Sequence, residues 1–345
     1  MIGCGKRHRM FQVLEAGTAD ALWLKAANWF TVGGLAVKQG SRGGLTAEVL
    51  CASLTLKHPR QRWITSREPA LNPAFALAEV IWIMCGRNDS GFLNYFNPRL
   101  PHYAGKGLTY HGAYGHRLRT HFGIDQLERA YTVLSRDHNS RQVVLQIWDT
   151  AEDLPSEDGT TRAEDVPCNI VALLKLREGR LEWTQIMRSN DLVLGLPHNI
   201  VQFSSLQEVL AGWLGVDVGS YNHFADSLHL YEQDAPISDR IAPRPLPLNV
   251  ESIALPKTTS ERSFSDLAAL GDMLSSPAAT PEDVLVRFQQ IDLDPGFRSW
   301  AAILTADALG RRKAFRMAES VMQDCSNPCL ATMFERWMQR HSNTS

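Results

Sequence analysis

The hydrophobic and polar positions of the first 231 residues switch repeatedly between strand-like and helix-like spacing. Short apolar runs between turn residues predict strands, and apolar residues three or four apart predict helices. Strands are expected at 46–56, 141–149, 168–176, 180–189 and 219–231. Helices are expected at 72–86, 125–137 and 199–215. The turn pair Glu178–Gly179 between two strand patterns indicates a hairpin. This mixture predicts an α/β (α+β) protein.

The pattern changes after Tyr231. Residues 235–262 are rich in proline and irregular, and residues 263–340 carry helical spacing throughout. Thr280, followed by proline and two acidic residues, is typical of a helix N-terminus. We therefore expect an α/β body over 1–234, a Pro-rich connector over 235–262 and a helical C-terminal region over 263–345.

Composition narrows the class of partner. The chain has 345 residues, of which 44% are hydrophobic and 21% charged, and its net charge is −2. This near-neutral balance argues against a nucleic-acid-binding surface, although a few arginines can hold one phosphate. No apolar run reaches membrane-spanning length, and the opening residues lead into no apolar core. We expect a cytoplasmic protein without a membrane partner.

The six cysteines are scattered, which is not a disulfide framework. Cys325 and Cys329 form a CxxxC pair, but a metal site needs two more ligands and only His341 is nearby. We therefore expect two ordinary thiols and no metal. Cys168 is different, because it follows Pro167 at the mouth of the apolar run in "EDVPCNIVALLKL". At that point a buried structural thiol and a reactive thiol both fit.

Four short stretches of the body suit an anionic, ring-shaped ligand. They are "SRGG" (41–44), "NSRQ" (139–142), "MRSNDLVLGLPHN" (187–199) and "DSLHLY" (226–231). Taken singly, each has an ordinary structural explanation. Loop arginines usually face solvent, Asn199 can cap a helix, and His229 can be a hydrogen-bonded core histidine.

The order and spacing of these stretches resemble the thymidylate synthase family. The resemblance runs from about Arg42 to Tyr231 and centres on "VPCNIVALLKL…RLEWTQIMRSNDLVLGLPHNI…LHLY". The family carries Pro-Cys at this strand, then R-S-x-D-x-x-L-G-x-P-x-N-I, then H-x-Y, and this combination is highly specific. The resemblance implies the family's mixed sheet with flanking helices. It also implies a pyrimidine nucleotide monophosphate as substrate and 5,10-methylenetetrahydrofolate as one-carbon donor.

The resemblance implies catalytic roles for four residues. Cys168 would be the nucleophile that adds to C6 of the pyrimidine, and Arg188 would favour its thiolate. Glu79 resembles the glutamate that organises water and proton transfers around the ring. Tyr114 resembles the tyrosine beside the nucleophile.

The resemblance also implies the substrate contacts. Arg42, Arg188 and Ser189 would bind the phosphate. Arg141 would reach the phosphate of a second subunit, which predicts a homodimer. The remaining expected contacts are Asn199 with the pyrimidine edge, His229 and Tyr231 with the ribose 3′-hydroxyl, and Asp191 beside the folate and the base. An amide pairs readily with uracil, so we expect uracil rather than cytosine and leave ribose versus deoxyribose open.

Several positions depart from the family pattern. Asn169 replaces the usual histidine after the cysteine, Met187 replaces a glutamine, and Gln142 replaces an arginine. Residues 90–110 contain no tryptophan, and the family's apolar C-terminal tail is not recognisable. A less closed site favours water over hydride at the last step, so a hydroxymethyl product is the alternative to methyl. We place methyl first because the helices of 263–345 can supply another lid. An inactive homologue that binds a nucleotide or a partner is the third possibility.

Overall fold

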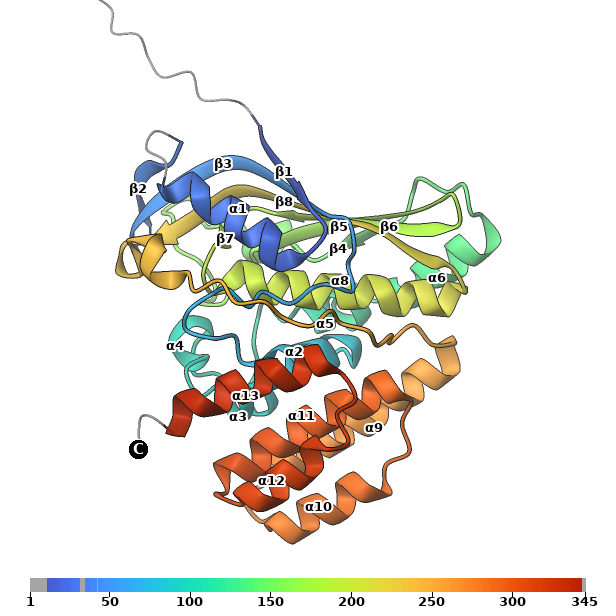
Figure 1. Ribbon diagram of the computed structural model, residues 1–345. Coiled ribbons are helices and arrows are strands. Elements are labelled where there is room, and N and C mark those ends of the chain that lie inside the picture. Colours follow the sequence, from blue (N-terminus) through green and yellow to red (C-terminus); the bar gives the residue numbers. More distant parts are fainter. Residues whose placement is uncertain (1–10, 32–34, 42, 343–345) are drawn as a thin grey trace, which may run out of the picture.

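The computed structural model describes residues 11–31, 35–41 and 43–342 (Figure 1). Its eight strands form one sheet in the order β1-β3-β8-β6-β5-β4, with β2 beside β3 and β7 beside β8. The strands are β1 (Gln12–Ala16), β2 (Val37–Ser41), β3 (Gly44–Leu56), β4 (Val144–Gln146), β5 (Asn169–Arg177), β6 (Arg180–Met187), β7 (Asn190–Asp191) and β8 (Asp217–Tyr231). The β1–β3, β6–β8 and β7–β8 pairs are parallel and the others antiparallel. The predicted α/β fold with a mixed sheet is confirmed.

One face of the sheet is covered by helices. α8 (Gly195–Leu214) runs along this face and α1 (Ala19–Thr31) lies beside it, below the sheet in Figure 1. The indole Nε1 of Trp23 donates a hydrogen bond to the carbonyl of Leu192, 2.8 Å away, which joins α1 to the start of α8. α6 (Gln126–Arg136) packs beside α8 near the β4 edge.

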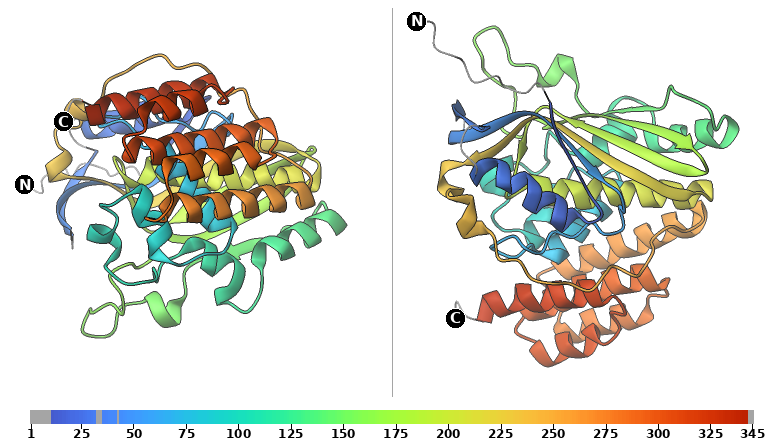
Figure 2. Two further views of the ribbon diagram at one scale, coloured as in Figure 1. Left: turned by 90° about the horizontal axis from the view of Figure 1, so that it is seen from below. Right: turned by 45° about the horizontal axis from the view of Figure 1, so that its top comes forward.

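Among the described residues, no helix lies over the opposite face of the sheet (Figures 1 and 2). The strand registers align Val13 with Ser53, Ser53 with Phe224, and Phe224 with Ile186 across four strands on this face. Val13 is 68% exposed. Polar residues such as Thr55 and Asn222, which hydrogen-bond to each other at 2.9 Å, lie on the same face. A sheet face that mixes apolar and polar residues and has no covering helix is a candidate interface.

α2 (Pro73–Met84) is the central helix of the molecule. Eleven of its twelve residues are buried, and Glu79 is the exception. α8 packs on one side of it, and α9 (Lys257–Ser275), α11 (Pro295–Arg311) and α13 (Pro328–Ser342) pack on other sides. The all-apolar composition of α2 explains this position, since a helix that is hydrophobic all round must be covered on every side.

Shorter helices and turns complete the structure. They are α3 (Ser90–Phe96), α4 (Pro101–Ala104), α5 (Tyr114–His116), a π-helical turn (Arg117–His121), α7 (Thr150–Asp153), 3₁₀ turns at Glu232–Asp234 and Ile237–Arg240, α10 (Pro281–Gln290) and α12 (Phe315–Met322). Among them, α10 and α12 belong to the C-terminal layer at the bottom of Figure 1. Figure 2, seen from below, shows the C-terminal helices spread across the lower surface. No described helix is both long and apolar enough to cross a membrane.

Several sequence predictions need adjustment. The helix α1 was not foreseen, and the strand expected at 141–149 is only three residues long. α8 begins at Gly195, four residues before the predicted start, so Pro197 falls in its first turn. Proline is well tolerated in a first helical turn, because the N–H groups there have no partner within the helix. The capping box at Thr280 is confirmed.

Candidate active site

Cys168 lies immediately before β5, and Arg188 lies at the end of the neighbouring strand β6. The backbone N–H of Arg188 donates to the carbonyl of Cys168 at 2.9 Å, which fixes the two residues side by side. The Nη2 atom of Arg188 lies 3.8 Å from the Cys168 sulfur. Nε donates to the carbonyl of Pro167, 2.8 Å away, and Nη2 also donates to that of Val166, at 3.1 Å. A held guanidinium beside a partly exposed thiol favours the thiolate, the nucleophilic form.

Tyr114 lies on α5 and packs against Phe203 of α8, with ring centroids 5.9 Å apart. Burial raises the pKa of Tyr114, and negative charge on Cys168, on Asp165 and on Glu79 raises it further. The phenol therefore keeps its proton and acts as a hydrogen-bond donor. The charge on Cys168 is the largest of these three electrostatic contributions to the raised pKa of Tyr114.

Asn169 follows the cysteine and is completely buried. Its Oδ1 accepts a hydrogen bond from Nε2 of Gln185 at 2.8 Å. Its Nδ2 makes no hydrogen bond of good geometry among the described residues, but the amide lies close enough to Tyr114 to oppose the rise in the pKa of that phenol. We therefore interpret Asn169 as a neighbour of Tyr114 at the site.

Glu79 of α2 meets His198 in the first turn of α8. The distance from Oε2 of Glu79 to Nδ1 of His198 is 2.6 Å, and each side chain is 15% exposed. The sequence had singled out Glu79 but not His198. Only the packing of α2 on α8 shows that these residues, 119 positions apart, form a pair.

Three of the expected ribose and phosphate contacts, Ser189, His229 and Tyr231, lie together where β7 pairs with β8. Oγ of Ser189 is 3.4 Å from Nδ1 of His229, and the rings of His229 and Tyr231 are perpendicular, with centroids 5.1 Å apart. A Cβ atom on Gly43 would lie 2.8 Å from the Tyr231 ring, so the loop before β3 passes against this group. Arg42 itself lies outside the described residues.

Asp191 and Asn199 frame the start of α8. Oδ1 of Asp191 accepts hydrogen bonds from the backbone N–H groups of Val193 and Leu194, at 2.6 and 3.1 Å. Burial raises the pKa of Asp191 against the opposing effect of these two donors. Nδ2 of Asn199 donates to Oε1 of Gln202 at 3.0 Å, which orients the amide.

Arg141 does not join this group within the subunit. Its side chain is exposed just before β4. The carbonyl of Val143 accepts from the N–H of Leu174 in mid-β5, so Arg141 lies toward the end of β5 opposite Cys168.

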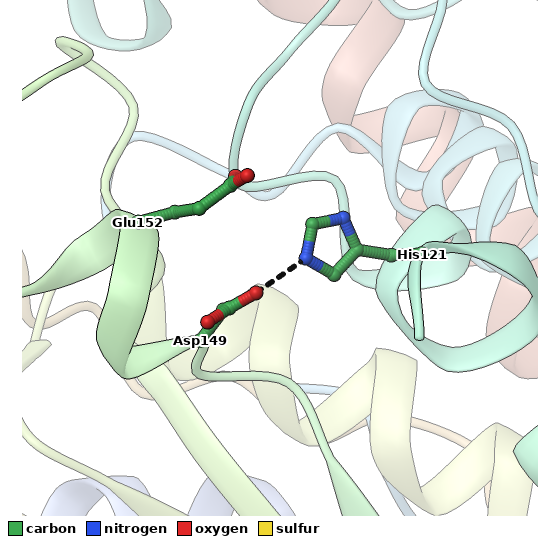
Figure 3. A group of neighbouring side chains, drawn as sticks. All are labelled: His121, Asp149 and Glu152. Atoms are coloured by element: carbon green, nitrogen blue, oxygen red, sulfur yellow. Dashed lines mark hydrogen bonds and ion pairs between the residues drawn. The ribbon is translucent and has the colours of Figure 1, made fainter. Parts of the chain in front are cut away.

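A second cluster contains His121, Asp149 and Glu152, whose ligand atoms lie within 4.8 Å of one another (Figure 3). Asp149 follows Trp148, over whose ring the Arg188 guanidinium lies at 5.7 Å from the centroid. Nε2 of His121 is 2.8 Å from Oδ2 of Asp149, and this contact is the main cause that lowers the pKa of Asp149. The buried guanidinium of Arg117 lies 3.3 Å from the same Nε2 atom. Because a fixed positive charge opposes a cation here, we interpret the cluster as an ion-pair network joining the π-helical turn to α7.

Comparisons with known proteins agree with this geometry. The chain is 32% identical over 277 residues to deoxyuridylate hydroxymethyltransferase of Pseudomonas phage M6, which covers 78% of this chain and 73% of the relative. It is 35% identical over 213 residues to the protein of the same name in Bacillus phage SP01, covering 57% of this chain and 55% of that relative. It is 32% identical over 217 residues to a putative thymidylate synthase of Methanothermobacter marburgensis, covering 61% of this chain and 88% of the relative. The thymidylate synthase family model matches residues 45–269, so the chain belongs to the thymidylate synthase family.

Proposed function

We propose that this enzyme transfers a one-carbon unit from 5,10-methylenetetrahydrofolate to C5 of deoxyuridine monophosphate. The observation that carries the proposal is the Cys168–Arg188 pair, in which a guanidinium lies 3.8 Å from a partly exposed thiol inside the matched family region. The names of the two phage relatives support deoxyuridylate as the nucleotide.

The proposed chemistry begins with the Cys168 thiolate. Its sulfur adds to C6 of the pyrimidine, which breaks the ring conjugation and gives C5 carbanion character. Tyr114, whose raised pKa keeps its proton, and the Asn169 amide would donate hydrogen bonds beside the reacting ring. Oδ1 and Nδ2 of Asn199 match the N3–H and O4 edge of uracil.

The residues around Asp191 fit a folate beside the nucleotide. The aminopyrimidinone edge of a folate presents N–H donors. Oδ1 of Asp191 accepts from the helix backbone, and Oδ2 of the same carboxyl group would accept from these donors. When bound, the folate supplies the methylene carbon. Asp191 would hold its ring, and Ser189 with Arg188 would hold the nucleotide phosphate.

We propose a homodimer for the active enzyme. The sheet face without a helix would pair with the same face of a second copy, as a twofold interface requires. Arg141 lies away from Cys168 within one subunit, which supports its delivery to the phosphate of the partner. We further propose the division into a catalytic body over 1–234, a connector over 235–262 and helices over 263–345, and a cytoplasmic location.

The product is methyl or hydroxymethyl, and the two phage relatives favour hydroxymethyl by name. The test is mass spectrometry of products from UMP, dUMP, CMP and dCMP with 5,10-methylenetetrahydrofolate. Cys168→Ser is the matched control, because it keeps the size of the side chain and removes the thiolate. We expect Cys168→Ser to lose turnover and keep nucleotide binding. Equal loss of binding and turnover, or no modified nucleotide from the wild type, would overturn the proposal.

A further inference from the structure

The pairing of Glu79 with His198 is a feature that the expected catalytic residues do not explain. Glu79 is the residue of α2 that escapes burial, and His198 is a partly exposed residue between buried Pro197 and Asn199 in α8. The two side chains meet between α2 and α8, and each keeps 15% of its surface exposed to solvent. The ring of Phe75, one turn before Glu79 on α2, packs against the imidazole with centroids 5.0 Å apart. The imidazole is thus held from two sides.

The contact fixes which nitrogen of His198 can act on a substrate. An ionised Glu79 carboxylate accepts hydrogen bonds and cannot donate them, so Nδ1 of His198 carries the proton at 2.6 Å. Nε2 is then left with its lone pair and can accept a proton. An imidazole oriented by a carboxylate in this way is the usual arrangement of a general base.

The pair and the proposed nucleophile are linked through Tyr114. The Tyr114 ring packs against Phe203 of α8, the helix that carries His198, with centroids 5.9 Å apart. Besides burial, negative charge on Cys168 and on Glu79 contributes to the raised pKa of Tyr114. His198 is adjacent in the chain to Asn199, the proposed contact of the pyrimidine edge. A general base at this site must be able to accept a proton. The residue after the cysteine is the amide Asn169, which cannot do so at neutral pH, whereas the imidazole of His198 on α8 can.

We propose that His198, oriented by Glu79, takes the proton from the water molecule that ends the reaction and so directs it to a hydroxymethyl product. This inference rests on the proposed function. The reacting species is the nucleotide joined to Cys168 at C6 and carrying a methylene group on C5. Water oxygen bonds to the methylene carbon while its proton passes to Nε2 of His198. The electron pair of the C5–methylene double bond moves to C5, C5=C6 re-forms, and the C6–S bond breaks to release the Cys168 thiolate. No oxidant or reductant is required.

The experiment separates carbon transfer from the water step. With 5-fluorodeoxyuridine monophosphate and 5,10-methylenetetrahydrofolate, the reaction stops before water enters, because the C5–F bond cannot release a proton. Intact mass then measures the covalent adduct on Cys168. With dUMP in place of the fluorinated nucleotide, chromatography and mass spectrometry measure the hydroxymethyl product. Both assays use the full chain with His198→Ala, with His198→Gln, and with His116→Ala as the matched control.

For His198→Ala and His198→Gln we expect adduct formation within about threefold of wild type and hydroxymethyl formation at least about 100-fold slower, a usual size for loss of a general base. Added imidazole should restore the product of His198→Ala at least about tenfold, and it should not affect His198→Gln, which leaves no space for it. His116→Ala should match wild type in both assays, since the described contacts of the His116 ring are with Thr120 and with the ring of His121, outside the proposed site.

Each other outcome has a distinct meaning. No adduct on wild-type Cys168 defeats the proposed function itself. Adduct in every variant, with hydroxymethyl formation unchanged or without imidazole rescue, overturns the role of His198 alone. Loss of the adduct in both His198 variants overturns it too, because His198 would then act before carbon transfer. A wild type that makes only the methyl product also overturns it.

Discussion

The guanidinium of Arg188 is held by the backbone carbonyls of Val166 and Pro167 and lies with Nη2 at 3.8 Å from the sulfur of Cys168. Two carbonyls thus position a positive charge beside a sulfur one residue further along the same segment. The cation cannot swing away without breaking both hydrogen bonds, so the thiol is under a fixed field rather than a fluctuating one.

Arg188→Gln should slow alkylation of Cys168 by iodoacetamide at pH 7 by about tenfold, because removal of the cation favours the thiol over the thiolate. Peptide mapping by mass spectrometry gives the rate for each cysteine. Cys85 is the internal control, since burial raises its pKa to about 11 and its alkylation should be slow in both proteins. Equal Cys168 rates in the two proteins would contradict the proposed role of Arg188.

Asn199→Asp should shift the substrate preference from dUMP toward dCMP. A carboxylate accepts from N4 of cytosine, and uracil offers a carbonyl at that position. The ratio of kcat/KM for the two nucleotides should change by about tenfold or more, which corresponds to about 1.4 kcal/mol. Gln202→Glu tests whether Gln202 orients the Asn199 amide, and it should lower kcat/KM for both nucleotides by a similar factor. A wild type that prefers dCMP would refute this interpretation of Asn199.

Phe224→Glu should convert a dimer into monomers. Phe224 lies on the sheet face without a helix, in register with Ser53 and Ile186, and a carboxylate there would be buried in a twofold interface. Sedimentation velocity measures the mass, and turnover should fall with it as Arg141 is withdrawn. Leu248→Glu is the control, since Leu248 is 61% exposed in the connector. Wild-type protein that sediments as an active monomer would exclude the dimer.

The C-terminal helices should unfold together with the sheet. Arg336 donates to the carbonyl of Thr65 at 2.5 Å, and Arg311 donates to that of Phe96 at 3.0 Å. Calorimetry should show one transition, and Gly271→Ala should lower it because the new Cβ would lie 2.5 Å from the Phe92 ring. Gly91→Ala, where nothing lies within 4 Å, should not lower it. Two separated transitions would show that the helices fold as an independent unit.

Stability should fall as the pH drops from about 6.5 toward 4.5. His223 is buried between Tyr221 and Asn190, and burial lowers its pKa to about 3. Below pH 6.5 the unfolded chain binds a proton that the folded chain refuses, so the free energy of unfolding decreases by up to about 1.4 kcal/mol per pH unit. Urea unfolding measures it. Carboxylates such as Asp149, whose pKa is lowered from 3.8, change the free energy of unfolding only at lower pH, where they become protonated. A flat profile over this window would contradict the buried neutral His223.

Local sequence predicted the elements whose signals are local. The hairpin formed as expected, because Glu178 and Gly179 both adopt positive φ, at 51° and 72°. Asn72 and Pro73 correctly marked the start of α2, where Asn72 accepts from the N–H of Phe75. The predicted length of β4 was too great, because an apolar run at a sheet edge does not show how many of its residues pair with the neighbouring strand.

The site was predictable only as far as its residues share one motif. Cys168 and Arg188 lie on neighbouring strands of a hairpin, so their proximity follows from the register. The Glu79–His198 contact depends on how α2 packs against α8, for which no short-range pattern exists. His198 also has no unusual neighbours in the sequence, so nothing around it indicated that it pairs with Glu79.

α2 has a structural role that reaches beyond its own carboxylate. The apolar side chains of α2 pack against α8 on one side and against α9, α11 and α13 on others. Glu79 lies on the same helix. A displacement of the C-terminal helices would therefore also displace the Glu79 carboxylate. A random screen for altered reaction outcome should thus recover substitutions among residues 257–339, far in sequence from the cysteine and without any contact to the nucleotide.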